Sequence, residues 1–442
     1  MKKKLSVISA LLMSLVVIAA SAFSAGAVKN TIDFDTKTDI LYLVNLDTDT
    51  VVYSKNSDKK CYPASTTKIM TYIITTEKVS NLEDTKVKIK EDLLNELAGT
   101  DSSLSGLEDY IDEELSVFQL LHCMMVSSGN DAALVLADYV GDGDVSAFVK
   151  LMNDKAKELG CNNTNFVNPH GLHDEKQYTT AEDMLKIARF AMTTPYFTDI
   201  TNTVEYYIDG EDEEALVNTN KMINPDEEDY YYEYAKGIKT GTTDEAGHCL
   251  ISSALKDDVA YMCIAYNAPC YDDDGNELET NYAILESKKL YEWAYENVSM
   301  RTVIGKDDKI CSIDVNYGDN SDKVDLVPEF EYSTMLSKSI DEKDITIETK
   351  CQEVIDAPVK QGTVLGTATV SYKGEELTRI NLVAAQTVEK SELKYVLTIV
   401  NNVITSLPFL IIVSIIAVLF IAYVILVNVF AVRKNKKRKS NT

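Results

Sequence analysis

The spacing of apolar residues predicts two folded regions of different kinds in the 442-residue chain. Between residues 66 and 192, apolar positions recur with the helical period of about 3.6, which gives each segment one apolar face. The predicted helices are 66–77, 117–126, 131–139, 145–159 and 181–192. Alternation predicts strands in 40–54, 249–255 and 259–266, and a helix follows at 280–297. Strands at both ends with helices between them predict an α+β domain over 28–297, in which helices cover an antiparallel sheet.

The pattern changes after residue 297, where apolar residues form short β-type runs separated by polar turns. These runs are 309–315, 323–326, 345–349, 364–372 and 377–383. They predict a small all-β domain over 298–390. Residues 391–406 are expected to form a stalk that leads from this domain to the end of the chain.

The first 27 residues have the pattern of a secretory signal peptide. Lys2, Lys3 and Lys4 precede an apolar run, 5–18, and a small-residue stretch ends in Ala25-Gly26-Ala27. A basic start, a short apolar core and an A-x-A site are typical of a cleaved signal, the alternative being an uncleaved anchor.

Near the other end, residues 407–432 carry no charge and would form a helix ~39 Å long at 1.5 Å per residue. That length spans a hydrocarbon core of ~30 Å with some tilt. The tail that follows, 433–442, is strongly basic, which is typical of a cytoplasmic flank. We therefore expect a single-pass protein of the cell membrane, with its folded body outside the cytoplasm.

Composition excludes several classes of function. The formal net charge is -27 and the body has no basic stripe, so nucleic acid is not an expected partner. The four histidines form neither an HExxH motif nor a cluster with paired cysteines, so no metal site is expected. Of the eight cysteines, Cys311 and Cys351 stand alone in their region and are the best candidate pair for a disulfide.

The first candidate chemical group is Ser65 with Lys68, because Ser65 opens an apolar helix. A lysine three residues later returns to the same helix face, where its amine can act as a base toward the hydroxyl. The same Ser-x-x-Lys spacing occurs at Ser57 and at Ser391, so the pattern alone is weak. Ser57 lies in a lysine-rich turn and Ser391 in the polar stalk.

Two further motifs follow along the chain. Ser128-Gly129-Asn130 lies in a break between two predicted helices, where a hydroxyl and a carboxamide can face a cleft. The alternative is an ordinary turn in which Asn130 caps the next helix. Lys239-Thr240-Gly241-Thr242 precedes an apolar strand. On an edge strand Gly241 would let a substrate backbone approach closely, while Lys239 and the threonine hydroxyls bind an anion; the alternative is a plain strand end.

Together, in this order, the motifs resemble the S-x-x-K, S-x-N and K-T-G elements of the penicillin-recognising serine enzymes. Within them the chain closely resembles the D-alanyl-D-alanine carboxypeptidases, the low-molecular-mass penicillin-binding proteins. The matching stretches are PASTTKIMT at 63–71, SGNDAA at 128–133, NPHGL at 168–172, GIKTG at 237–241, AG at 246–247, APVKQG at 357–362 and LVAA at 382–385. The resemblance covers about residues 35–390 and implies a β-lactamase/transpeptidase-like domain followed by the family's C-terminal β domain.

The resemblance also implies roles. Ser65 would attack the carbonyl of the penultimate D-alanine of a peptidoglycan stem pentapeptide, and Lys68 would take its proton. Ser128 would pass a proton to the leaving D-alanine, and Asn130 would hold the substrate amide and orient Lys68. β-Lactam antibiotics would acylate the same serine, and no cofactor is implied.

On the neighbouring strand, the resemblance implies that Lys239 supplies positive potential and that Thr240 and Thr242 lie near the substrate's terminal carboxylate. The N–H groups of Ser65 and Thr242 would form the oxyanion hole. Several family members carry an arginine before an ESKKL-like segment, and this chain has none near Ala283. We therefore expect weaker affinity for the carboxylate.

Three other functions remain open on sequence grounds. A β-lactamase would need an acid that activates water between the second and third motifs, where Glu175 and Glu182 occur. A cross-linking transpeptidase usually carries a large additional N-terminal module. A non-catalytic wall-binding protein would have no need of three intact motifs.

Overall fold

The computed structural model describes residues 30–100, 102–208 and 214–439. They divide into two compact units. The N-terminal unit lies within Ala25–Arg301 and Ser333–Asp344, and the β unit comprises Thr302–Tyr332 and the chain from Ile345 onward.

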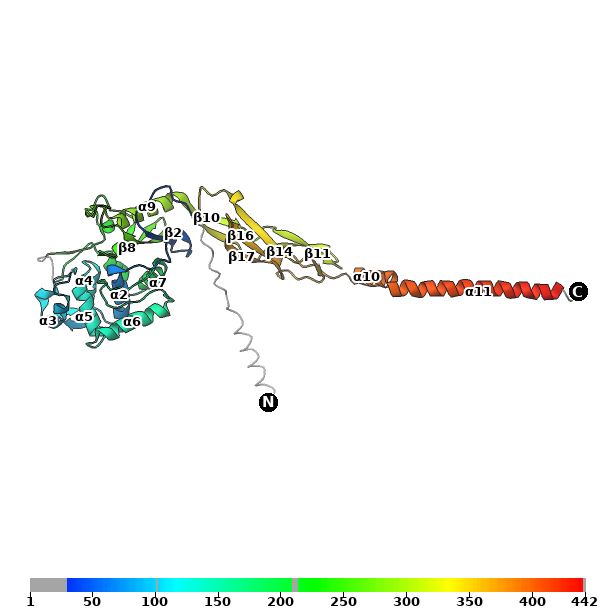
Figure 1. Cartoon of the computed structure of the whole chain (residues 1–442), viewed down its shortest axis with the longest axis horizontal. Helices are drawn as coiled ribbons and strands as arrows, with labels where there is room; N and C mark the ends of the chain where they lie inside the picture. Colours follow the sequence, from blue (N-terminus) through cyan, green and yellow to red (C-terminus); the bar gives the residue numbers. More distant parts are fainter. Residues whose placement is uncertain (1–29, 101, 209–213, 440–442) are drawn as a thin grey trace, which may run out of the picture. The chain divides into compact units, whose positions relative to one another are not determined.

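A five-stranded antiparallel sheet is the centre of the N-terminal unit (Figure 1). Its strands, in spatial order, are β2 (Val51–Lys55), β1 (Ile40–Asn45), β9 (Val259–Ala268), β8 (Gly247–Lys256) and β7 (Ala235–Thr243). The predicted strands are confirmed. Because β7 is the last strand, its outer edge has no neighbour within this sheet and can accept an extended substrate.

Both faces of this sheet are covered, which follows from the alternation of buried residues along β1. Ile40, Tyr42 and Val44 pack into one core cluster with helices α2, α4, α5, α6 and α7, whereas Leu41 and Leu43 pack with α9. The bounds of these helices are α2 Lys68–Lys78, α4 Val117–Met125, α5 Asn130–Val140, α6 Val145–Glu158, α7 Ala181–Ala191 and α9 Tyr282–Asn297. Each predicted helix is confirmed to within about two residues at each end.

Shorter elements connect this framework. The helices are α3 Glu91–Leu94 and α8 Phe197–Thr201, with 3-10 turns at Asn95–Leu97, Leu107–Tyr110, Lys221–Ile223 and Glu342–Asp344. The paired strands are β3 Lys86–Lys88 with β4 Glu114–Ser116, β5 Glu205–Tyr206 with β6 Leu216–Val217, and β10 Val298–Ile304 with β13 Tyr332–Ser337.

The β unit contains a six-stranded sheet, which confirms the predicted all-β character; its shortest strand, β15, was not predicted. In spatial order its strands are β14 (Ile345–Cys351), β16 (Val364–Tyr372), β17 (Glu375–Ala384), β12 (Lys323–Pro328), β11 (Cys311–Asn316) and β15 (Val354–Asp356). Its core contains Ile313, Val315, Val324, Leu326 and Leu382.

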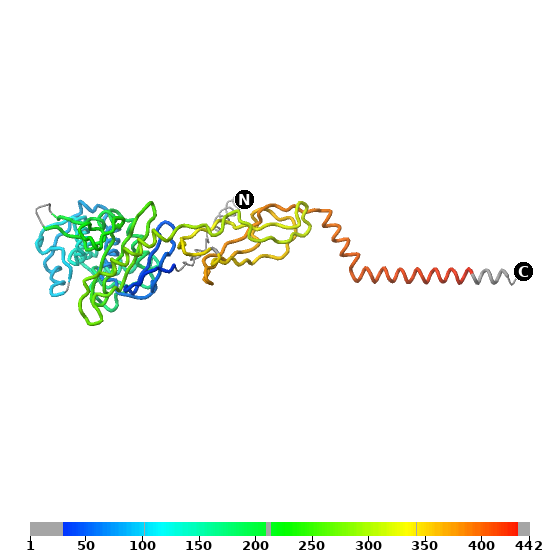
Figure 2. Tube along the Cα trace, turned by 90° about the horizontal axis from the view of Figure 1, so that it is seen from above, coloured from blue at the N-terminus to red at the C-terminus, as the bar shows by residue number. Residues whose placement is uncertain are grey.

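Two helices end the described chain, drawn in orange and red in Figure 2. The predicted stalk contains an amphipathic helix, α10 (Glu392–Thr405), which the sequence analysis did not predict. Helix α11 (Leu407–Lys439) contains a stretch, Leu407–Ala431, with a mean hydropathy of 3.3, and is long and apolar enough to cross a membrane. The predicted signal peptide lies outside the described residues.

Candidate active site

Ser65 lies at the start of the first predicted motif, but not in the α-helix itself. It belongs to a 3-10 turn, Ala64–Thr67, and α2 begins only at Lys68. The turn begins at Ala64, whose φ is 44°. The side chains still meet as the spacing predicted, because Lys68 Nζ lies 2.9 Å from Ser65 Oγ.

Lys68 is completely buried and makes three polar contacts. Besides Ser65, its Nζ donates to Asn130 Oδ1 at 2.6 Å and to the backbone oxygen of His170 at 2.7 Å. Burial, together with the nearby charge of Lys239, holds the pKa of Lys68 well below its usual range, although Asp131 opposes this shift. An amine with a lowered pKa can be neutral at physiological pH and accept a proton from a hydroxyl.

Ser128 and Gly129 of the second motif lie between α4 and α5, as predicted, whereas Asn130 already belongs to α5. Ser128 is buried with a φ of 66°, and Asn130 is the first residue of α5. Both polar atoms of the Asn130 carboxamide are hydrogen-bonded: Oδ1 accepts from Lys68, and Nδ2 donates to Ser102 Oγ at 3.1 Å. The N-cap position of α5 is Gly129, so the alternative that Asn130 caps this helix is wrong.

The third motif lies on β7, whose Gly241 passes directly beside the serine. A Cβ at Gly241 would lie 2.8 Å from the backbone nitrogen of Ser65, so only glycine allows this approach. Lys239 is buried, and burial lowers its pKa to about 7. Thr240 Oγ1 lies 2.5 Å from Thr219 Oγ1, and Thr242 Oγ1 lies 3.1 Å from His248 Nδ1.

Two loops contact these groups, and each is named as a wall after the residue that it contacts. The first is the Asn130 wall (residues 102–107), in which the backbone oxygen of Ser103 accepts a hydrogen bond from the N–H of Asn130 at 2.8 Å. It is held by the buried carboxylate of Asp131, which accepts hydrogen bonds from the N–H and hydroxyl of Ser105 and from the N–H of Leu107.

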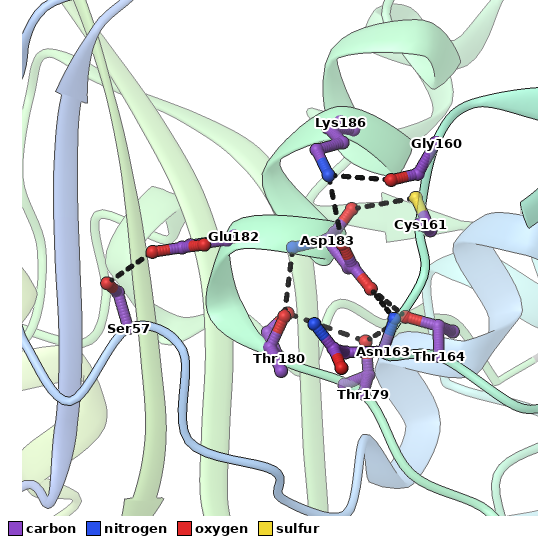
Figure 3. Close-up of polar contacts among 10 residues, drawn as sticks. All are labelled: Ser57, Gly160, Cys161, Asn163, Thr164, Thr179, Thr180, Glu182, Asp183 and Lys186. Carbon is purple, nitrogen blue, oxygen red and sulfur yellow. Dashed lines mark hydrogen bonds and ion pairs between the residues drawn. The ribbon is translucent and has the colours of Figure 1, made fainter. Parts of the chain in front are cut away.

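The Lys68 wall (residues 161–179) supplies the oxygen of His170 and accepts the Thr71 hydroxyl at the oxygen of Pro169, at 2.6 Å. Figure 3 shows its base, where Asp183 accepts from the N–H of Asn163 at 2.8 Å and the hydroxyl of Thr164 at 2.9 Å. Burial and Lys68 lower the pKa of His170 to about 3, so its ring stays neutral.

The contacts of the two walls were missed by the sequence analysis. The NPHGL stretch was noted for its resemblance, but no role was given to the His170 carbonyl. Ser102, Ser103 and Thr219 lie in polar loops, where no periodicity marks them, and each reaches the site through a contact that is distant in sequence.

The two other Ser-x-x-Lys patterns have different surroundings from Ser65 and Lys68. Ser57 Oγ donates to Glu182 Oε1 at 2.9 Å, and Lys60 lies over the ring of Tyr178 (Figure 3 shows the Ser57 contact). Lys394 donates to the oxygen of Gly318 and to Asp322. The contact with Ser57 also occupies Glu182, and Glu175 is exposed.

Comparisons with known proteins agree with this geometry. The family model for D-alanyl-D-alanine carboxypeptidase matches residues 26–270, and that for the C-terminal domain of penicillin-binding protein 5 matches residues 299–390. The chain belongs to the D-alanyl-D-alanine carboxypeptidase family. It is accordingly a serine-type carboxypeptidase.

Individual relatives match more than three quarters of the chain. It is 30% identical over 395 residues to D-alanyl-D-alanine carboxypeptidase DacF of Bacillus subtilis, covering 88% of this chain and 96% of the relative. DacC of Escherichia coli is 29% identical over 77% of this chain and 81% of its own length.

Solved structures share the fold. Penicillin binding protein 5 from Haemophilus influenzae has a TM-score of 0.57 at 25% identity, covering 82% of this chain and 100% of that one. DacD from Francisella tularensis has a TM-score of 0.63 at 24% identity, with coverages of 85% and 100%.

Proposed function

We propose that this membrane-anchored carboxypeptidase removes the terminal D-alanine from peptidoglycan stem pentapeptides through an acyl-enzyme on Ser65. The observation that carries the proposal is the buried Lys68 amine, 2.9 Å from Ser65 Oγ and held by Asn130 and His170. These contacts fix the amine where it can accept the serine proton as the hydroxyl attacks.

Acylation then needs a place for the negative oxygen. The N–H groups of Ser65 and Thr242 are suited to hold it, because Gly241 brings β7 against the serine backbone. A missing oxyanion donor typically costs ~3–4 kcal/mol of transition-state stabilisation. Ser128, buried at the break before α5, passes a proton to the departing D-alanine, while Asn130 holds the substrate amide.

The terminal carboxylate is bound by Lys239, Thr240 and Thr242. With a pKa of about 7, Lys239 is only partly charged near neutral pH, and an incoming carboxylate favours its charged form. Ala283 is buried at the start of α9, and no arginine stands beside it. We therefore expect a higher KM for D-Ala-D-Ala peptides than in an arginine-bearing relative; equal KM values under matched conditions would contradict this.

For location, we propose that α11 anchors the protein in the cell membrane as a single pass, with the N-terminal and β units outside and the basic tail in the cytoplasm. The apolar stretch Leu407–Ala431 and the lysines and arginines that follow it support this orientation. The proposed layout is a signal peptide at 1–27, the catalytic domain, the β domain to 390, a stalk, the membrane helix and the tail.

The test uses the full chain in detergent micelles with a peptide ending in D-Ala-D-Ala. D-Alanine release is measured together with the mass of the penicillin adduct, for the natural protein, Ser65→Ala and Ser57→Ala. Ser57 is the matched control, because it begins a second Ser-x-x-Lys pattern but contacts Glu182.

We expect release and a single adduct that both disappear in Ser65→Ala and persist in Ser57→Ala. Rapid turnover of penicillin would instead indicate a β-lactamase, and an adduct without D-alanine release a transpeptidase. Neither activity in a folded protein would indicate a non-catalytic wall-binding protein. Each of these results overturns the proposal.

A further inference from the structure

Two cysteines of the β unit lie in contact across its sheet. Cys311 is the first residue of β11 and Cys351 the last residue of β14. Their sulfur atoms are 2.9 Å apart, and both side chains pack, half-buried, against the core of this unit. A covalent bond needs ~2.05 Å between the sulfurs, so a small rotation of the side chains brings them together.

The position of the pair in the sheet explains what such a bond would join. Strands β14 and β11 are separated by three others in the spatial order, so sheet hydrogen bonding alone leaves them apart. The sheet nevertheless folds back on itself, because the chain passes from β14 within two residues to β15, which pairs in parallel with β11. Cys351 stands at this crossing, where the sheet folds over.

A neighbouring glycine leaves room for the contact. Gly366 lies opposite Cys351 in the register of β14 and β16. A Cβ at Gly366 would lie 2.8 Å from the sulfur of Cys351. A residue larger than glycine at position 366 would displace the side chain of Cys351. Gly366 therefore allows Cys351 to keep the orientation in which it contacts Cys311.

We propose that Cys311 and Cys351 form a disulfide that closes the folded sheet of the β unit. The oxidant is a low-molecular-mass or protein disulfide, RSSR, of the kind an exported domain meets. One cysteine attacks RSSR, forming a mixed disulfide and releasing RSH; the other then attacks the mixed disulfide and releases the second RSH. One S–S bond forms, one breaks, and the two thiol protons leave with the two RSH molecules.

The bond is tested on the full chain in detergent micelles, equilibrated with oxidised and reduced glutathione, alkylated and digested with trypsin without reduction. Cleavage after lysine releases Cys311 in peptide 310–323 and Cys351 in peptide 351–360, each with a single cysteine. We expect these peptides as one cross-linked species, lighter than the two thiol peptides by two hydrogen atoms, that separates on reduction.

Variants check the stability of the unit. Oxidation should raise the Tm of the β unit by roughly 10 °C, because the bond closes a long loop. Cys311→Ser and Cys351→Ser should each abolish this shift, and Cys270→Ser, a half-buried cysteine of the other unit, should retain it. Two alkylated peptides after oxidation, or two separate glutathione adducts, would overturn the proposal.

Discussion

The two walls of the active site hold the catalytic groups by different means. Besides its contacts with Asn130 through Ser102 and Ser103, the Asn130 wall is held by one buried carboxylate, Asp131, which accepts hydrogen bonds from the N–H and hydroxyl of Ser105 and from the N–H of Leu107. The Lys68 wall has Asp183 at its base, but it is also tied by backbone bridges between Cys61 and Thr179 and between Asn165 and Tyr178. We therefore expect removal of Asp131 to disturb the Asn130 wall more than removal of Asp183 disturbs the Lys68 wall.

Within the Lys68 wall itself, the contact of Gly171 with the serine turn is the exception to this redundancy. Gly171 has a φ of +98°, and a Cβ there would lie 2.0 Å from the backbone oxygen of Ala64. Gly129 lies next to the other wall, and a Cβ there would meet side-chain atoms of Asp131 and of Ser105 in that wall at 2.6 Å. Side chains can rotate away, whereas the backbone before Ser65 cannot.

Gly171→Ala should therefore have the largest effect, because it displaces Ser65 from Lys68. A misplacement of about 1 Å can cost ~10²-fold in rate, and we expect at least this loss in the rate of acylation by penicillin. Gly129→Ala should lose less, about tenfold. Gly143→Ala is the control. Gly143 has a φ of +83° and open space around it, so alanine there causes the same kind of backbone strain as at Gly171 but no steric clash. Equal losses in all three variants would contradict the steric argument.

Asp131→Ala should have the next largest effect. It leaves buried donors of Ser105 and Leu107 without an acceptor, at about 1–3 kcal/mol for each group, and frees the wall that contacts Asn130. We expect a lower Tm and an acylation rate reduced by about 10- to 100-fold. Asp183→Ala should also lower the Tm, but the remaining bridges should keep acylation within about threefold of the natural rate. If Asp183→Ala lost as much acylation as Asp131→Ala, the two walls would be equally dependent on their carboxylates.

How far the sequence predicts these features depends on the range of the contact. Local periodicity predicted the helix that carries Lys68 and the helix that follows the second motif, although Asn130 was expected just before the latter; one face of each helix is buried whatever it packs against. The 3-10 turn at Ser65 was not predicted, since it depends on the contact of Gly171 with Ala64. Ser102 and Thr219 carry no local signal, because they reach the site across the fold.

Helix α10 could have been predicted from local periodicity. Leu393, Val396, Leu397 and Val400 have helical spacing, so the signal for an amphipathic helix was present in the region interpreted as a stalk.

The chemical roles of the motif residues could not be predicted from spacing or periodicity. Their side chains meet in the structure, but the assignment of each role came from family resemblance and from chemistry, because spacing along the chain carries no information on which group accepts a proton.

The pH dependence of activity is the smallest and most specific test of the comparison between the walls. Lys68 must be neutral to accept the serine proton, so kcat/KM for D-alanine release should rise with pH through the pKa of Lys68. Lys239 must be charged to bind the carboxylate, so kcat/KM should fall again as pH rises through about 7. The negative charge of Asp131 favours the charged form of Lys68.

Asp131→Asn keeps an acceptor oxygen but removes this charge, so the pKa of Lys68 should decrease and the acidic limb of the profile should move to lower pH. Asp183→Asn is the matched control on the other wall; Asp183 is absent from the charges that act on Lys68, and its variant should leave that limb in place. The basic limb belongs to Lys239, whose pKa is lowered by burial alone, and it should not move in either variant. Two results would show that Asp131 does not act on Lys68 through its charge. One is a shift of the acidic limb to higher pH in Asp131→Asn, and the other is an equal shift to lower pH in Asp131→Asn and in Asp183→Asn. The effect of its removal on acylation would then come entirely from the loss of the loop that holds Asn130.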